Sequence, residues 1–348
     1  MRNDIIFVQQ DLRYLSWTRT RKSSGTAGSF LKSYDDSGEK KLYYKLSDYD
    51  PQTGVVGHEC VNEIIAGRLM ELLGIPHLEY SLLNAMILID GKEESTFLRR
   101  SADFKEKTQK KIILEEFYAS ECVGRETPFD FCIRMGWENM IFGMLVTDYL
   151  IINRDRHGAN IEILIDRKDK SIRPAPLFDQ GLSLLCRCRT PEEIAAFDPL
   201  GDPAVQSFIG GRSTADNLKL VLREFLRGLK ARGLKGMLLV TSDAHEGLRD
   251  ALFREFPSVP WQRCQFHFSR NISEKAPKKY QAGLRSELNE MFNSRTLAEA
   301  VTVRDRIIAD YGVVAPAAMA NVAQSKEEEH RGHAPSHPQR FQGIRPEA

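Results

Sequence analysis

Short alternations of apolar and polar residues, separated by turn residues, run through the first hundred positions of the chain. Residues 41–46, Lys-Leu-Tyr-Tyr-Lys-Leu, are typical of a strand and follow a turn at 35–38. An apolar run over 78–89 ends at Asp90-Gly91, a dipeptide typical of a tight hairpin. The pattern predicts a small β-rich lobe over residues 1–100.

Inside this lobe, residues 57–73 change to the period of an α-helix, and Gly74-Ile75-Pro76 ends it. Glu59 and Glu63 stand four residues apart and therefore share one face of the helix. The apolar residues expected together on one side are Val61, Ile64, Ile65, Leu69 and Leu72.

Two helical regions are expected next. Residues 104–125 are rich in charge and indicate a surface helix region, whereas 137–152 is strongly apolar and indicates a core helix. Asp148 lies one turn before the end of the second helix. It either braces the loop that follows or caps the helix.

That loop holds the most chemically complete set of polar residues in the chain. Asp155 and Asn160 stand five residues apart and Asp179 follows nineteen residues later, with apolar runs between them that predict a hairpin. Phosphoryl transfer needs such a set, because one carboxylate accepts the proton of the acceptor hydroxyl while an amide oxygen and another carboxylate hold Mg²⁺. The order of these residues predicts a kinase-type site, with a structural loop as the alternative.

Residues upstream could complete this site. Lys45 lies in the strand that follows the turn at 35–38, and in a kinase-like lobe one of Glu59 and Glu63 would pair with the strand Lys; Glu63 is preferred because it lies deeper in the helix. His157 is either a general base or a structural residue that fixes Asp155. A small-residue turn could bring backbone amides to phosphates, or could be a plain surface hairpin; it contains Gly25, Thr26, Gly28 and Ser29.

Length, composition and net charge indicate the general class of the protein. A chain of 348 residues with 28% charged and 42% hydrophobic residues predicts an ordinary globular protein of two domains. A net charge of +1 gives no overall attraction to nucleic acid or membrane. Six scattered Cys, a polar start and no apolar run long enough to span a membrane predict a reduced, soluble, cytoplasmic protein.

The cluster Asn153-x-Asp155-Arg156-His157-x-x-Asn160 and the pair Phe178-Asp179 resemble the catalytic loop and metal-binding turn of HipA-like serine/threonine kinases. The resemblance covers about residues 15–220. It implies a two-lobed kinase-like fold that uses ATP and Mg²⁺, with Asp155 as catalytic base, Asn160 and Asp179 as metal ligands and Lys45 facing the phosphates. It also implies a protein substrate and an antitoxin-like partner of the kind found in toxin–antitoxin pairs.

The character of the chain changes near residue 220. A basic amphipathic helix over 221–233, an apolar strand over 237–241 and a helix over 248–256 show the alternation of an α/β layer. Asp243 follows the strand, where α/β sheets place their chemistry, although it could equally be the N-cap of the next helix. Cys264 and His267 could be half of a zinc site, but a packed Cys and a hydrogen-bonded His are preferred.

Residues 226–271 resemble Mutator-type transposases, in which Ser242-Asp243-Ala244-His245-Glu246-Gly247-Leu248 carries the second acid of a three-carboxylate site on a ribonuclease-H-like fold. Strand transfer with two metals needs several converging carboxylates, and only Asp243 is present here. We therefore expect no transposase activity. The alternative function is that of a DNA-binding remnant, which would bind phosphates non-specifically through basic helices over 275–306. The acids interleaved in these helices instead favour a solvent-exposed face.

The expected fold is an α+β protein-kinase-like two-lobed fold followed by a partial α/β ribonuclease-H-like transposase fragment. The lobes are predicted at 1–100 and 101–220, the fragment at 221–322 and a disordered tail at 323–348. HipA-like kinases have further helices after the metal-binding turn, so the second lobe is expected to be truncated by the change of sequence near 220. The sequence thus predicts a chimeric or interrupted gene product.

Overall fold

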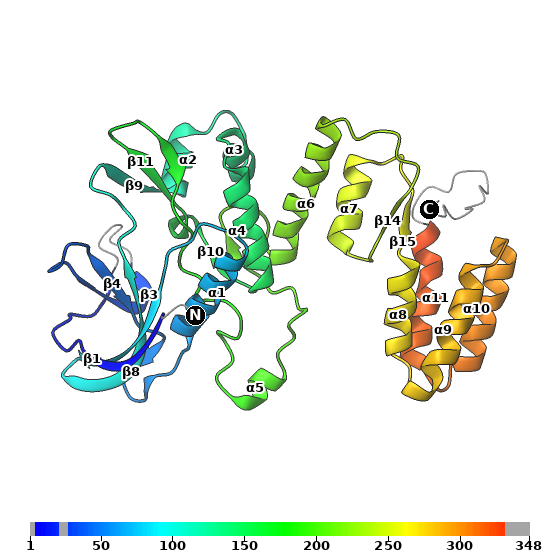
Figure 1. Ribbon diagram of the computed structural model, residues 1–348, viewed down its shortest axis with the longest axis horizontal. Helices are drawn as coiled ribbons and strands as arrows, with labels where there is room; N and C mark the ends of the chain where they lie inside the picture. The colour runs from blue at the N-terminus through cyan, green and yellow to red at the C-terminus, as the bar shows by residue number, and fades with distance from the viewer. Residues whose placement is uncertain (1–3, 21–26, 331–348) are drawn as a thin grey trace, which may run out of the picture. The chain divides into compact units, whose positions relative to one another are not determined.

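The computed structural model describes residues 4–20 and 27–330, and the chain divides into two compact units, 1–221 and 222–348 (Figure 1). The division falls one residue from the change of character at 220 that the sequence indicates. Of the described residues, no helix is both long and apolar enough to cross a membrane.

A mixed six-stranded sheet with the order β1-β7-β8-β4-β3-β2 forms the first part of the first unit. Alternate residues of β7 (Leu83, Ala85, Ile87 and Ile89) are buried, as expected for a strand with one face in a core. Asp90 and Gly91 both have positive φ and form the predicted two-residue hairpin turn. The strands are β1 (Ile5–Asp11), β2 (Thr18–Thr20), β3 (Ala27–Asp35), β4 (Leu42–Lys45), β7 (Ser81–Ile89) and β8 (Lys92–Ala102).

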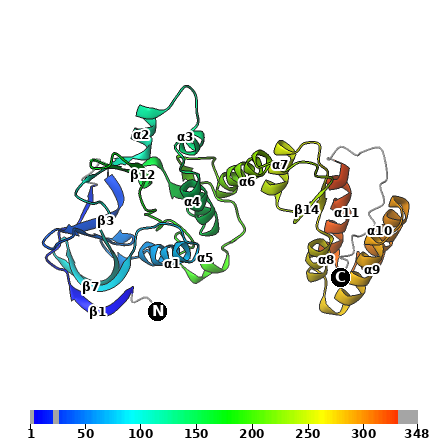
Figure 2. The same cartoon turned by 45° about the horizontal axis from the view of Figure 1, so that its top comes forward.

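Helix α1 (Glu59–Leu72) lies alongside this sheet (Figures 1 and 2). The predicted apolar face was partly wrong, because Val61, Ile65 and Leu72 are exposed, Leu72 at 86%. The buried face is centred instead on Glu63, whose charge is neutralised by two cations inside the protein. Burial of this ion-paired Glu turns the helix away from the orientation that hydrophobicity alone indicates.

The second part of the first unit is built around α4 (Glu138–Leu150), whose Ile141, Met144 and Leu145 are fully buried as predicted. The prediction of a helical region over 104–125 was wrong in its first half, since 109–113 form a strand. Ile112 and Lys111 of that strand pair with β11, so its backbone hydrogen bonds decide against a helix. The elements here are β9 (Gln109–Ile113), α2 (Leu114–Glu121), α3 (Pro128–Arg134), β11 (Glu162–Asp166) and β12 (Ile172–Pro174), with the sheet order β12-β11-β9.

Short elements complete the first unit. The hairpin β11–β12 joins the two halves of the polar cluster, as predicted. Strand β10 pairs in parallel with β13, which places Asp155 opposite Gln206. These elements are β5 (Tyr49–Asp50), β6 (Gly54–Val55), β10 (Asp155–Arg156), the 3₁₀ turn η1 (Gly158–Asn160), α5 (Pro191–Ala195), β13 (Gln206–Ser207) and the start of α6 (Thr214–Ala231).

The second unit contains the predicted α/β alternation, because β14 and β15 pair in parallel across α7. Four helices follow, with Leu284 and Leu288 fully buried in their shared core. The prediction of disorder from 323 was wrong as far as His330, since a helix continues through this stretch of good helix formers such as Gln, Lys and Glu; 331–348 lie outside the described residues. The elements are β14 (Val240–Ser242), α7 (Glu246–Glu255), β15 (Trp261–Arg263), α8 (Gln265–Glu274), α9 (Lys278–Phe292), α10 (Leu297–Tyr311) and α11 (Pro316–His330).

Candidate active site

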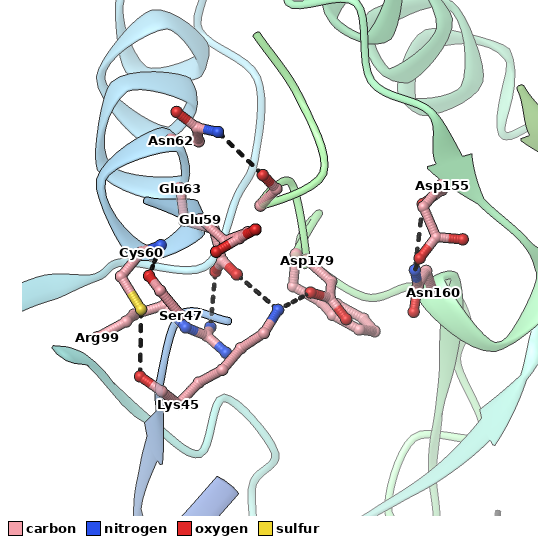
Figure 3. Close-up of polar contacts among 12 residues, drawn as sticks. Lys45, Ser47, Glu59, Cys60, Asn62, Glu63, Arg99, Asp155, Asn160 and Asp179 are labelled. Atoms are coloured by element: carbon pink, nitrogen blue, oxygen red, sulfur yellow. Dashed lines mark hydrogen bonds and ion pairs between the residues drawn. The ribbon is translucent and has the colours of Figure 1, made fainter. Parts of the chain in front are cut away.

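Lys45 lies at the centre of a buried ion-pair cluster in the first unit (Figure 3). Its Nζ is 2.8 Å from Glu63 Oε1 and also contacts Asp179 Oδ1. Burial alone would lower the pKa of the Lys45 ammonium, but the carboxylates of Asp179 and Glu63 outweigh that effect and raise it. Lys45 is therefore a fixed cation held by two acids that are distant in sequence.

The structure distinguishes between the two acids of α1. Glu63 is fully buried and pairs with Lys45, as preferred from the sequence. Glu59 instead accepts a hydrogen bond from the backbone N–H of Asp48, at 3.0 Å. Its carboxylate thus fixes a loop and takes no part in the contact with Lys45.

Asp179 stands at the turn after β12 with a positive φ of 62°, which is unusual for a residue with a side chain. Burial by itself would raise the pKa of its carboxyl group, but Lys45 and Arg99 more than compensate and lower it. The backbone N–H of Asp179 donates to the hydroxyl of Tyr80 at 3.1 Å. Asp179 is held as a carboxylate in a defined turn.

Asp155 and Asn160 face one another across η1 (Figure 3). The side-chain amide of Asn160 donates to the carbonyl of Asp155 at 3.1 Å and lies 3.4 Å from its Oδ2. His157 Nδ1 accepts the Ala159 N–H, and its Nε2 lies 3.5 Å from Asp155 Oδ1. This arrangement favours the structural alternative for His157, because the ring caps the turn and contacts the acid.

Arg156 links the loop of Asp155 to other segments, a role that the sequence did not indicate. Its guanidinium makes two hydrogen bonds to Asp148, at 2.8 and 2.9 Å, and donates to the carbonyl of Phe178 at 2.9 Å. Asn153 donates to the same Asp148 at 2.8 Å. Of the two roles left open for Asp148, the structure shows the bracing one, and Arg156 ties this brace to the turn that carries Asp179.

Arg99 and Tyr80 also belong to the cluster without having been predicted. Arg99 Nη1 is 3.0 Å from Glu63 Oε2, and its guanidinium carbon lies 4.5 Å from the centre of the Tyr80 ring. The alternation of β8 could have placed Arg99 beside Lys45 had the pairing of β8 with β4 been known. No local motif indicates that pairing.

The oxygen donors present suit a magnesium site completed by phosphates, because Mg²⁺ is commonly held by one or two carboxylates together with substrate oxygens. Asp179 would offer a carboxylate and Asn160 an amide oxygen to such a metal. Across 4–20 and 27–330, no three His, Cys, Asp or Glu side chains lie close enough to hold a metal by themselves. Two residues of the predicted nucleotide turn, Gly25 and Thr26, lie outside the described residues. Gly28 and Ser29 lie in β3, and their burial is not described.

The second unit places Asp243 beside His267, with Oδ1 2.9 Å from Nδ1 but without the alignment of a hydrogen bond. The N-cap alternative for Asp243 was wrong, because His245 Nδ1 accepts the Leu248 N–H at the start of α7. Cys264 precedes α8 and belongs to no metal-binding group in the described chain. The preferred packed Cys and hydrogen-bonded His were not found in that form, because Cys264 is only partly buried and His267 Nδ1 contacts Asp243 without a hydrogen bond.

The comparison with solved structures found one that is similar over most of the chain. A solved structure, the crystal structure of a Helicobacter pylori proinflammatory kinase CtkA, is similar with a TM-score of 0.42 and 14% identity, covering 91% of this chain and 99% of that one.

Two curated relatives that are 44% identical to this chain are transposases, and each matches a quarter of the chain or less. A transposase for insertion sequence element IS256 in transposon Tn4001 from Staphylococcus aureus is 44% identical over 87 residues, or 25% of this chain and 22% of that protein. A transposase for element ISRM5 from Rhizobium meliloti is 44% identical over 78 residues, or 22% and 20%. The chain thus spans about a fifth of the length of these relatives. Residues 213–330 match the model of the family described as Transposase, Mutator family, and this region of the chain therefore carries a Mutator-family transposase domain.

Proposed function

We propose that the first unit is an ATP- and Mg²⁺-dependent serine/threonine protein kinase resembling the HipA toxins. The observation that carries the proposal is the convergence of Lys45, Glu63 and Asp179 from β4, α1 and the turn after β12. A buried Lys held by an acid on a helix and lying beside an acid of a turn is the arrangement that phosphoryl transfer uses to fix phosphates and metal.

The residues of the site would divide the chemistry between them. Asp155 would accept the proton of a Ser or Thr hydroxyl, and His157 would keep its carboxylate oriented. Lys45 would face the phosphates, while Asn160 and Asp179 would supply oxygen ligands to Mg²⁺. Bound Mg²⁺ would neutralise charge that develops on the transferred phosphoryl group.

Transfer of radiolabelled phosphate from γ-labelled ATP to the protein itself tests this proposal. The Asp155→Asn variant should lose about 10²-fold or more of the signal, the usual contribution of a positioned base. Asp169→Asn is the matched control: Asp169 lies in the β11–β12 turn and accepts the Ser171 N–H, which Asn can also do. Equal labelling of Asp155→Asn, Asp179→Asn and the control would refute the kinase mechanism.

A second function is proposed for the second unit because its sequence belongs to a transposase family. We infer that it associates with DNA through basic side chains without catalysing strand transfer. Several of these cations already have acidic partners, such as Arg306 with Glu290 at 2.7 Å and Arg270 with Glu274 at 2.9 Å.

Fluorescence anisotropy of a labelled DNA duplex at a series of salt concentrations measures the association. Binding through phosphates should weaken steeply as salt rises, because neutralised phosphates release counterions. An affinity that does not change with salt, or the absence of binding at low salt, would contradict this second proposal and leave the kinase proposal unaffected.

A further inference from the structure

Two positive side chains stand directly opposite one another in the sheet beside the candidate site. Lys45 of β4 is the register partner of Arg99 of β8. Like charges at directly opposite positions destabilise an antiparallel pair, so this placement needs compensation. Glu63 provides it, with Oε1 at 2.8 Å from Lys45 Nζ and Oε2 at 3.0 Å from Arg99 Nη1.

The second cation determines how Glu63 and Lys45 share their charge. Glu63 is fully buried and Arg99 is 12% exposed, so little water screens the contact. With Asp179 included, the cluster holds two cations and two anions. If Arg99 were neutral, Lys45 would be the cation left in contact with Glu63, and its ammonium would be held more tightly against that carboxylate.

Tyr80 connects Arg99 to the turn that carries Asp179. One face of its ring lies against the Arg99 guanidinium, at 4.5 Å from the ring centre, within the range of a cation–π contact. Its hydroxyl accepts the backbone N–H of Asp179 at 3.1 Å. Tyr80 is itself buried, so this hydrogen bond has no ready replacement from water.

We propose that Arg99 and Tyr80 are positioning residues of the nucleotide site. Arg99 neutralises part of the negative charge of Glu63, so that Lys45 is bound less tightly by Glu63 and can contact a phosphate. Tyr80 keeps the Asp179 turn in its positive-φ conformation, which keeps the carboxylate in place for a metal. The inference rests on the proposed kinase function and adds to it two residues that none of the sequence motifs contains.

The two roles are tested by measuring ATP binding with calorimetry, first at a fixed Mg²⁺ concentration and then over a range of Mg²⁺ concentrations. This measurement does not require turnover. Arg99→Met should weaken ATP binding roughly tenfold, the effect of losing one charged contact, and Arg99→Lys should restore part of it. Tyr80→Phe should raise the Mg²⁺ concentration needed for half-maximal ATP binding about threefold to tenfold, because it removes only the hydrogen bond to Asp179. A residue with a purely structural role would not separate these two readouts.

Arg100→Met is the matched control, since Arg100 is the next residue of β8 and points to the opposite face of the strand. Thermal unfolding without ligand shows whether each variant is folded, and Tyr80→Phe tests the inference even if Arg99→Met does not fold. If the unmodified protein binds ATP and the Arg99 and Tyr80 variants match Arg100→Met, the inference is refuted and the proposed function stands. If the unmodified protein binds no ATP at any Mg²⁺ concentration, the proposed function fails and the inference with it.

Discussion

The buried pair of Arg156 and Asp148 gives the sharpest test of how the loop that carries Asp155 is supported. The side chains are 3% and 4% exposed, and two hydrogen bonds join them. Arg156→Met would leave the Asp148 carboxylate buried without its cation, a change that costs about 3–5 kcal/mol. Asn153 still donates to Asp148, which favours the lower end, while loss of the hydrogen bond to Phe178 adds about 1 kcal/mol. We expect a loss of about 4 kcal/mol from the free energy of unfolding of the first unit.

Urea unfolding followed by tryptophan fluorescence measures this loss in the right unit. The chain has three Trp, and in a Trp261→Phe background the signal comes from Trp17 and Trp137, which both belong to the first unit. This choice avoids treating two units as one two-state system. Arg173→Met, at an exposed position on β12, is the control and should change stability by less than about 0.5 kcal/mol.

A double-mutant cycle decides whether the pair itself is responsible. Because Asp148→Asn removes the charge that Arg156→Met would leave unpaired, the double variant should lose less than the sum of the two single losses. Strict additivity, or an Arg156→Met variant as stable as Arg173→Met, would refute the explanation.

Three further predictions concern thiols, acid and the second core. Burial raises the pKa of the Cys132 thiol to about 12, so iodoacetamide should label exposed Cys122 in the native protein and reach Cys132 only after denaturation, as mass spectrometry of peptides would show. The pKa of Asp179 is lowered in the folded state, so its contribution to stability is present above its unfolded value of about 3.9 and is lost below it. The difference in unfolding free energy between the unmodified protein and Asp179→Asn should therefore shrink from about pH 5 to about pH 3, and a constant difference would contradict the linkage. Leu284→Ala should destabilise the helical core of the second unit by about 2–5 kcal/mol in thermal unfolding, whereas Leu297→Ala, at a position 69% exposed, should have little effect.

The parts of the site that the sequence predicts are those set by local pattern. The hairpin that separates Asp155 and Asn160 from Asp179 has apolar strands that are visible in the sequence, and the structure confirms this hairpin. Lys45 ends a strand and Glu63 lies on a helix, and a single long-range pairing brings them together.

The parts that could not be predicted depend on pairing between distant segments. Arg99 enters the cluster only because β8 pairs with β4, and Tyr80 only because it packs beneath Arg99. The exposed side of α1 was misassigned for a related reason. From sequence alone, an acid such as Glu63 is assigned to the surface, because the cations that neutralise it inside the protein come from distant segments.

The helix α6 changes how the junction between the two sequences is understood. The Mutator-family match begins at residue 213, yet the compact first unit continues to Val221. Leu220 and Val221 pack against the apolar core that contains Ile141 of α4. The first turns of the helix where the Mutator-family match begins therefore pack against the core of the first unit.

Asn217 of the same helix holds a turn of the first unit in place. Asn217 is buried and accepts the N–H of Gly211 at 2.6 Å, in a turn where Gly210 has a φ of 113°. This turn follows β13, whose Gln206 is the register partner of Asp155. The Mutator-family match thus begins about two turns of helix before the first compact unit ends. Asp155 belongs to this first unit, whose core includes residues from both stretches of sequence.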